Sequence, residues 1–128
     1  VVIDDKLHVV GGRTVVGGNL AAHHRYDPQG DRWREAAPMP LAQAGLAAAS
    51  LDGYLYAFGG ERFGQHERVF AESWVYDPKT DTWAALPDMP TARHGLGAVA
   101  VDGRIYVIGG AKGVGGNDTT GSVDIFQP

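Results

Sequence analysis

A repeat of about 50 residues constrains the fold of this chain more than any other feature. When the sequence is shifted by 50 positions, residues 26–60 align with residues 76–110 without a gap, and 16 of these 35 positions are identical. The identical positions include a Tyr-Asp-Pro triplet, a tryptophan, a Met-Pro pair, an Asp-Gly pair and a double glycine. Partial copies of the same unit occur at both ends of the chain. Such a period predicts an array of similar units packed side by side.

Each unit is expected to contain four short β-strands and no helix. Residues 95–101 are small and apolar, Asp102-Gly103 is a hairpin-turn signal, and residues 104–108 are β-branched and aromatic. After the double glycine, a polar loop leads to a third strand at residues 122–126, and the copy before it adds a fourth strand around Trp83. Four strands per unit, repeated, are typical of β-propeller blades.

The spacing of the double glycine, the tyrosine and the tryptophan resembles the kelch repeat. The resemblance covers nearly the whole chain and implies an all-β propeller of four-stranded antiparallel kelch blades. It also implies that the repeated residues pack strands and blades together and do not carry function. These structural kelch positions are Gly11, Gly12, Gly59, Gly60, Gly109, Gly110, Tyr26, Tyr76, Phe126, Trp33 and Trp83.

The expected units are a partial first blade over residues 1–36, a full blade over residues 44–86, and a blade over residues 95–128 without its outer strand. Kelch propellers usually have six or seven blades, so a segment of fewer than three would be a partial or half propeller. Two arrangements are then open: an excerpt of a longer propeller chain, or two half-rings that pair as a homodimer to complete a six-bladed ring.

The candidate binding residues lie where loops of successive units converge on one face of a propeller. They follow each double glycine or precede each inner strand, and they are Arg13, Arg62, Lys112, Gln43, Arg93 and His94. Arginine in such a place suits capture of a carboxylate or phosphate. Glu61 occupies the same region, and the loops over residues 62–72 and 112–121 are long and polar.

Other features argue against several classes of function. The formal net charge of −4 and the absence of a Lys/Arg cluster speak against nucleic-acid binding, and no apolar run is long enough to cross a membrane. No cysteine is available for thiolate chemistry or metal binding. His23 and His24 are adjacent on an expected strand, so their rings point to opposite faces, and no metal or cofactor is expected. The segment Gly113–Asn117 lacks the ending of a phosphate-binding loop and is interpreted as a flexible connector.

The leading hypothesis is therefore a non-catalytic binding module or scaffold that holds a protein segment, or a small acidic or sugar ligand, at its loop face. The first alternative is a sugar-acting enzyme similar to the bacterial sialic-acid mutarotases of the kelch family, for which Arg13, Arg62, Arg93 and His94 would supply polar groups. The second alternative is a carbohydrate-binding accessory domain, in which Phe63 and Phe70 would stack on sugars.

Overall fold

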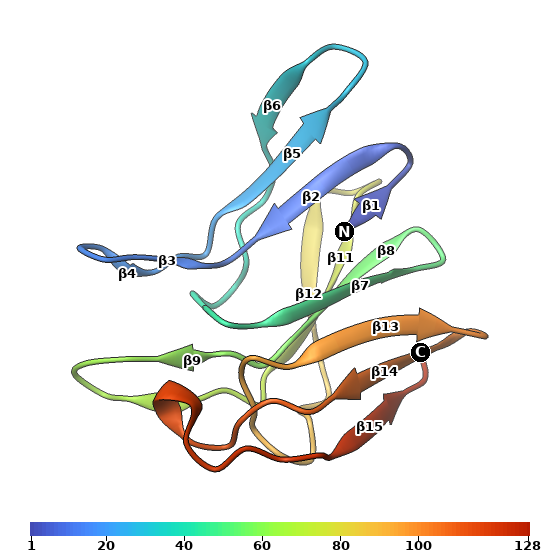
Figure 1. The fold of residues 1–128 in the computed structure, drawn as a ribbon. Helices are drawn as coiled ribbons and strands as arrows, with labels where there is room; N and C mark the ends of the chain where they lie inside the picture. Colours follow the sequence, from blue (N-terminus) through green and yellow to red (C-terminus); the bar gives the residue numbers. More distant parts are fainter.

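Three antiparallel sheets follow one another in the computed structural model, which describes all 128 residues (Figure 1). Each sheet is one blade, and its strands are hydrogen-bonded in chain order from the inner to the outer edge. Blade 1 consists of β1 (Val2–Ile3), β2 (Lys6–Val10), β5 (His23–Asp27) and β6 (Arg32–Glu35). Blade 2 consists of β7 (Ala47–Leu51), β8 (Tyr54–Phe58), β11 (Ser73–Asp77) and β12 (Thr82–Leu86). Blade 3 consists of β13 (Gly97–Val101), β14 (Arg104–Ile108) and β15 (Val123–Phe126).

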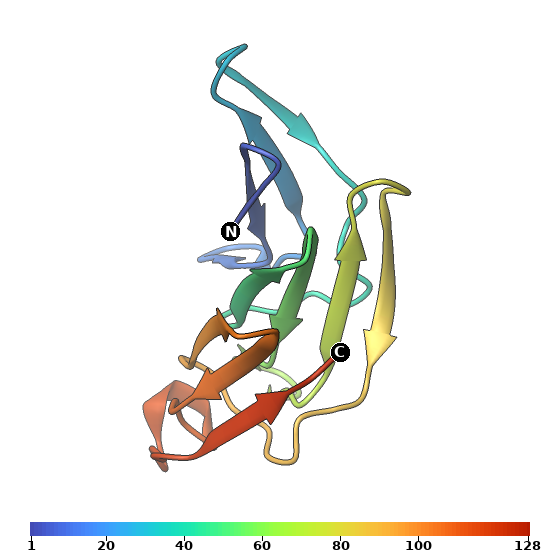
Figure 2. The same cartoon turned by 90° about the vertical axis from the view of Figure 1, so that its right-hand side faces the viewer.

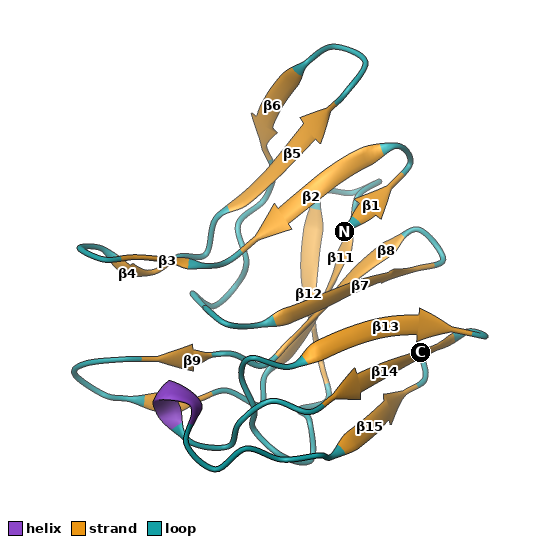
Figure 3. Ribbon diagram, viewed as in Figure 1, coloured by secondary structure: helices purple, strands orange, loops and turns teal.

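This architecture confirms the expected fold class, because the sheets are four-stranded or three-stranded, antiparallel and stacked as propeller blades. The inner strands β7 and β13 lie side by side, and the three sheets fan outward from that edge (Figure 2). No α-helix is present, and one 3-10 turn, η1 (Val114–Gly116), is the single helical element (Figure 3). No helix in the structure is long and apolar enough to span a membrane.

The hairpins within each blade turn at the aspartates that the sequence marks. Asp52 and Gly53 connect β7 to β8 with φ angles of 51° and 82°, and Asp102 and Gly103 connect β13 to β14 with φ angles of 49° and 73°. Two successive positive φ angles define the turn whose twist matches that of the two strands, and Asp-Gly tolerates this conformation. The register is therefore fixed locally: Leu51 pairs with Tyr54 and Val101 pairs with Arg104.

Two small apolar cores hold the blades together, one at each seam. Between blades 1 and 2, the buried side chains of Ile3, Met39, Leu55, Ala57 and Tyr76 form one cluster. Between blades 2 and 3, the cluster consists of Ala49, Tyr56, Phe58, Met89, Ile105 and Val107. Side chains alternate along β8, so Leu55 and Ala57 face blade 1 whereas Tyr56 and Phe58 face blade 3. A blade therefore uses both faces for packing.

The tryptophan of the outer strand packs blade 2 onto blade 1. Trp83 donates a hydrogen bond from Nε1 to the backbone oxygen of Ala37 at 2.8 Å, and its ring lies 5.5 Å from the His23 ring. The hydroxyl of Tyr76 donates to Asp81 at 2.8 Å, which closes the turn before Trp83. Trp33 occupies the same position in blade 1 and is 53% exposed, because no blade of this chain lies against that face.

Candidate functional site

The double glycine brings the chain close to the segment that leads into the blades. Gly59 and Gly60 have φ angles of 66° and 120°, which L side chains rarely adopt. A Cβ atom on Gly60 would lie 2.7 Å from the carbonyl oxygen of Ala44, so a side chain at this position would also clash. The amide of Gly60 donates to the Arg93 carbonyl, and the amide of Glu61 donates to the Ala44 carbonyl. The residue after the double glycine is thereby fixed at the end of its blade.

After each double glycine, the chain projects to one side of the blades, which we call the loop face. In blade 1 the projection is a hairpin of β3 (Arg13–Thr14) and β4 (Gly18–Asn19), and in blade 2 it is a hairpin of β9 (Glu61–Arg62) and β10 (Arg68–Val69). In blade 3 it is the loop that carries η1. Figure 3 shows the three projections on the same side of the molecule. The expected loop over residues 62–72 is thus partly a β-ribbon.

Glu61 connects the loop-face projections of all three blades. Its carboxylate is only 3% exposed and accepts hydrogen bonds from Arg13 Nη2 at 2.9 Å and from the amide of Gly115 at 2.9 Å. His94 Nε2 lies 3.2 Å from the same carboxylate and donates to the Gly113 carbonyl at 2.7 Å. Burial alone would raise the pKa of Glu61, but the Gly115 amide and the Arg13 guanidinium outweigh burial and hold that pKa below its usual value.

A groove of about 640 Å³ lies between the hairpins of blades 1 and 2. Arg13 and Arg62 line it, and Phe63, 47% exposed, has the Arg13 guanidinium 4.4 Å from its ring centre. Val15 and Val16 at the tip of the β3–β4 hairpin also line the groove and are fully exposed. The groove therefore combines cationic groups with uncovered apolar side chains.

One asparagine fixes the two hairpins relative to each other. Asn19 Nδ2 donates to the Glu61 carbonyl at 2.7 Å and to the Ala42 carbonyl at 3.3 Å. With the Arg13–Glu61 ion pair, this contact connects the β3–β4 hairpin to blade 2 on both strands. The groove walls are thus held in place before any ligand arrives, which reduces the entropic cost of binding.

The structure places two of the expected binding residues inside the blades and not at the surface. Gln43 and Arg93 are fully buried. Gln43 Nε2 donates to the Gly59 carbonyl at 2.7 Å, and its Oε1 accepts from Trp74 Nε1 at 2.6 Å. Arg93 donates to the Gly109 carbonyl at 2.7 Å and to Asp124 at 2.6 Å. The expectation that both side chains face a ligand is corrected by this geometry. Gln43 joins neighbouring strands within blade 2, and Arg93 joins neighbouring strands within blade 3.

This structural role has a sequence signal that residue-by-residue interpretation misses. In both units the buried residue and its partner are 31 positions apart: Gln43 with Trp74, and Arg93 with Asp124. The exchange is chemically matched, because an indole N–H donor faces an amide oxygen in one blade, whereas a guanidinium faces a carboxylate in the other. A comparison of residues 43 and 74 with residues 93 and 124 of the next repeat would have indicated that the two side chains of each pair are in contact.

Of the remaining expected residues, His94 is also buried, beside Glu61, whereas Arg13, Arg62 and Lys112 lie on the loop face and differ in whether an ion pair compensates their charge. Arg13 is paired with Glu61, and Lys112 lies 3.3 Å from Asp118. Arg62 donates from Nε to the His66 carbonyl at 3.0 Å and has no acidic partner within 4.0 Å. Ion pairs therefore compensate two of these three cations. Arg62 is the one of these three cations whose charge is not compensated by an ion pair.

Two other sequence expectations concern the loops. The segment over residues 113–117 contains η1, and the Gly113 amide donates to the Asn117 carbonyl at 2.9 Å while Gly115 binds Glu61. The interpretation of this segment as a flexible connector thus omits its internal hydrogen bonds. Phe70 is fully buried, and the Arg68 guanidinium lies 4.7 Å from its ring centre, so Phe70 is not placed to stack on a sugar. Phe63 is exposed.

A buried histidine pair lies at the seam between blades 1 and 2. His8 Nδ1 and His23 Nε2 are 2.9 Å apart, and His23 Nδ1 donates to the Ala37 carbonyl at 3.1 Å. Burial, together with the neighbouring His23 and Arg25, lowers the pKa of His8 to about 4, and burial also lowers the pKa of His23. No group of three or more His, Cys, Asp or Glu side chains is arranged to hold a metal ion.

Comparison with known proteins gives three matches to one repeat family. The kelch motif matches residues 1–40, 44–90 and 92–128, which together span nearly the whole chain. The three matched segments correspond to blades 1, 2 and 3. Each match contains a double glycine, which precedes the loop-face projection of its blade.

Three curated relatives share parts of this sequence. The chain is 42% identical over 60 residues to beta-scruin and 39% identical over 59 residues to alpha-scruin, both from Limulus polyphemus. It is 40% identical over 63 residues to the human Kelch-like protein 35. These alignments cover 47%, 46% and 49% of this chain, but only 7%, 6% and 11% of the three relatives. The shared part is thus a small fraction of each relative.

Proposed function

Because this chain belongs to the kelch-repeat family, we propose that it is a non-catalytic binding module that holds a segment of a protein partner. The segment lies in the groove between the β3–β4 and β9–β10 hairpins. Arg62 carries the proposal, since its guanidinium is the uncompensated charge beside exposed Phe63 and Val16. The volume of about 640 Å³ is in the range that small ligands and short peptide segments occupy.

The lining defines the chemistry of the partner. A carboxylate of the partner would pair with Arg62, because a guanidinium offers two parallel donors that match two carboxylate oxygens. An apolar side chain next to this carboxylate would cover Phe63 and the valines at the hairpin tip, which removes apolar surface from water. The proposed partner is therefore an acidic peptide segment with an apolar residue beside the acidic one.

A displayed library of random 12-residue peptides tests this proposal directly. Selection on the immobilised chain is expected to enrich peptides with Asp or Glu beside an apolar residue. Fluorescence anisotropy with a selected, labelled peptide then measures Kd. Arg62→Ala and Phe63→Ala are each expected to weaken binding by roughly tenfold.

Arg34→Ala is the matched control. Arg34 is an exposed arginine on β6, so this substitution removes the same charge at a position away from the groove. Equal losses of peptide affinity from Arg34→Ala and Arg62→Ala would mean that the peptide is attracted by net charge and not by the groove, which would contradict the proposal. A sialic-acid panel is the second arm. Saturable sialic-acid binding that Arg62→Ala abolishes, with no peptide enriched, would favour the sugar-acting alternative instead.

A further inference from the structure

Three arginines lie on one face of the two outer strands of blade 1. Arg25 on β5 stands directly opposite Arg34 on β6, and Arg32 lies two residues before Arg34 on the same side of its strand. Arg25 is half-buried, whereas Arg32 and Arg34 are exposed. No carboxylate oxygen lies within 4.0 Å of any of these three guanidinium groups. Three positive charges without an ion pair therefore share this face.

The face that carries the three arginines is turned toward blade 2. Arg25 pairs across the sheet with His8, and the His8 ring lies in the seam, 5.8 Å from the ring centre of Tyr76. The charge of Arg25 contributes to the lowered pKa of His8, after burial and the neighbouring His23. Blades 1 and 2 both border this place, so its surroundings belong to the described chain.

A small cavity of about 180 Å³ lies between the outer strands of blades 1 and 2. It is lined by Arg25, Glu35, Ala36, Tyr76, Pro78 and Asp81. Pockets that enclose a drug-sized ligand measure about 300–1,000 Å³, so this cavity can admit a small charged group and not a whole ligand of that size. The rest of a ligand would lie outside the cavity, across the exposed side chains of Arg32 and Arg34.

The carboxylates around this face are engaged by other donors or point away. Asp27 forms an ion pair with Lys6 at 3.0 Å. Asp81 accepts hydrogen bonds from a backbone amide at 2.9 Å and from the Tyr76 hydroxyl at 2.8 Å. Glu35 is the residue after an arginine on β6, so its side chain points to the opposite face of the sheet. The three guanidinium groups are therefore available to an external anion.

The next blade shows that this position in the fold does not require charge. Under the 50-residue repeat, Arg25 and Arg34 correspond to Val75 and Ala84, which stand opposite each other on β11 and β12. Two like charges directly opposite each other destabilise a sheet, whereas an apolar pair does not. The arginine pair of blade 1 thus costs stability unless an anion binds between the two side chains.

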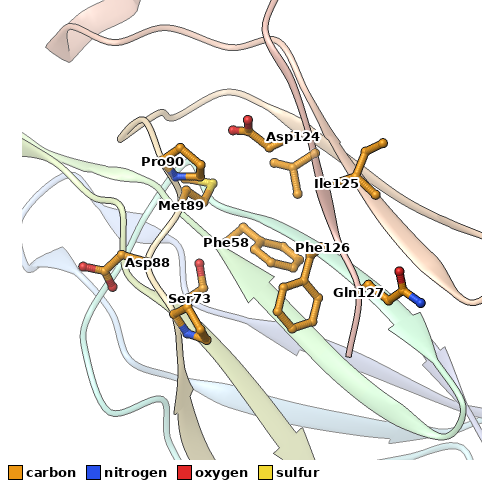
Figure 4. A pocket seen from close by; sticks show the side chains of 11 residues that line it. Phe58, Ser73, Asp88, Met89, Pro90, Asp124, Ile125, Phe126 and Gln127 are labelled. Carbon is orange, nitrogen blue, oxygen red and sulfur yellow. The ribbon is translucent and has the colours of Figure 1, made fainter.

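The cavity at the next seam has a different lining. Between blades 2 and 3, Figure 4 shows the rings of Phe58 and Phe126 together with the side chain of Met89. The residues that line this second cavity include two aspartates but no arginine or lysine. Positive charge is therefore a local feature of the seam between blades 1 and 2.

We propose that Arg25, Arg32 and Arg34 form a docking site for a phosphorylated side chain of a protein partner. A phosphate monoester carries a charge of about −1.5 to −2 at pH 7 and three acceptor oxygens, which match the paired donors of guanidinium groups. The phosphate occupies the cavity beside Arg25, where its charge converts the repulsion between Arg25 and Arg34 into attraction to a common anion. The partner segment that carries the phosphate lies across the exposed arginines.

A labelled peptide with one phosphoserine in an otherwise uncharged sequence tests the proposal by fluorescence anisotropy. We expect saturable binding, and binding weaker by roughly tenfold or more for the same peptide with unmodified serine. In the chain, Arg25→Gln and Arg34→Gln should each weaken binding of the phosphopeptide by roughly fivefold or more. Arg104→Gln is the matched control, because Arg104 is an exposed arginine on β14 that also lacks an ion pair, and it should change Kd by less than about twofold.

Urea unfolding separates loss of the site from loss of the fold. In phosphate-free buffer of low ionic strength, the unfolding midpoint of Arg34→Gln should equal or exceed that of wild type, because the substitution removes one of two opposed like charges. Inorganic phosphate should raise the midpoint of wild type above its value in chloride of equal ionic strength, because a ligand of the folded state stabilises it. The midpoint of Arg34→Gln should respond equally to the two salts.

Several results would overturn the proposal. These are equal affinity for the phosphorylated and unmodified peptides, equal losses from Arg34→Gln and Arg104→Gln, and amide chemical shifts that fall on the loop face and spare residues 25–35. Tighter binding to phosphatidic-acid vesicles than to the phosphopeptide would also overturn it, because the phosphate would then belong to a lipid surface. Arg62→Gln should leave binding of the phosphopeptide unchanged, so this test and the test of the function proposed above can fail separately.

Discussion

Acidification should destabilise this protein through the histidine pair at the seam between blades 1 and 2. His23 Nδ1 donates to the Ala37 carbonyl, so His23 Nε2 is the acceptor and His8 Nδ1 the donor of their mutual hydrogen bond. This assignment follows from the hydrogen-bond network and requires His23 to be neutral, because a proton on its Nε2 would leave His8 Nδ1 without an acceptor. A second proton would place a charge in a buried apolar seam next to Tyr76 and Trp83.

The magnitude follows from the lowered pKa of His8. Its pKa falls from 6.5 to about 4, so the unfolded chain binds a proton at a higher pH than the folded chain. The contribution of neutral His8 to the free energy of unfolding is then fully present above pH 6.5 and is lost as the pH falls toward 4. Between pH 7.5 and pH 5, His8 alone should remove at most about 2 kcal/mol of unfolding free energy. The pKa of Asp81 and of Glu61 is lowered, so both remain charged in this window and do not add to the loss.

Urea unfolding at several pH values between 7.5 and 5, followed by tryptophan fluorescence, measures this loss. His8→Gln should flatten the pH dependence by about 2 kcal/mol, because glutamine can donate a hydrogen bond to His23 without titrating. His66→Gln is the matched control, since His66 is an exposed histidine on the β9–β10 hairpin. If His8→Gln leaves the pH dependence of wild type unchanged, the reasoning from this buried pair is refuted.

Three further stability predictions can be checked by the same unfolding measurement. Trp83→Ala should cost about 3 kcal/mol because it empties the seam between blades 1 and 2, whereas Trp33→Ala, at the exposed equivalent position, should cost less than about 1 kcal/mol; equal losses would contradict the assignment of the seam. Arg93→Met should lower the free energy of unfolding by about 3 kcal/mol, because it leaves the Gly109 carbonyl without its donor and Asp124 without its ion pair. Lys112→Met, which breaks an exposed ion pair, should lower it by less than about 1 kcal/mol. An equally small loss for Arg93→Met would show that the buried guanidinium does not stabilise the fold. Gly60→Ala should cost more than Gly53→Ala by about 1 kcal/mol or more, because both have positive φ but only Gly60 faces a carbonyl oxygen at close range; the reverse order would argue against the close approach at Ala44.

The sequence could predict the blades because their determinants are local and repeated. Asp102-Gly103 specifies its own hairpin, and the alternation of residues 104–108 specifies which side chains face the neighbouring blade. Comparison of Trp33 with Trp83 also identifies the packing position. Each of these signals depends on a few neighbouring residues, and each occurs in at least two copies that support one another.

The candidate site was less predictable because it depends on contacts between blades. Arg93 and Arg62 both belong to segments that the repeat assigns to the loop face. Arg93 is nevertheless buried and donates to the Gly109 carbonyl, and no local sequence pattern distinguishes it from Arg62. Glu61 binds Arg13, which is 48 positions away, and Gly115, which is 54 positions away. The β3–β4 hairpin is held against blade 2 by Asn19, which donates to the Glu61 carbonyl 42 positions away, a contact that no local sequence pattern indicates.

The most direct test of the proposed function is a map of amide chemical shifts on the isotope-labelled chain during titration with a peptide selected from the random library. The binding groove predicts that the largest shifts fall in residues 13–19 and 62–64, with smaller changes at residues 113–116 through the Glu61 contact. Shifts that fall mainly on the outer strands β6 and β12, with residues 13–19 and 62–64 unaffected, would contradict the assignment of function to the hairpin groove.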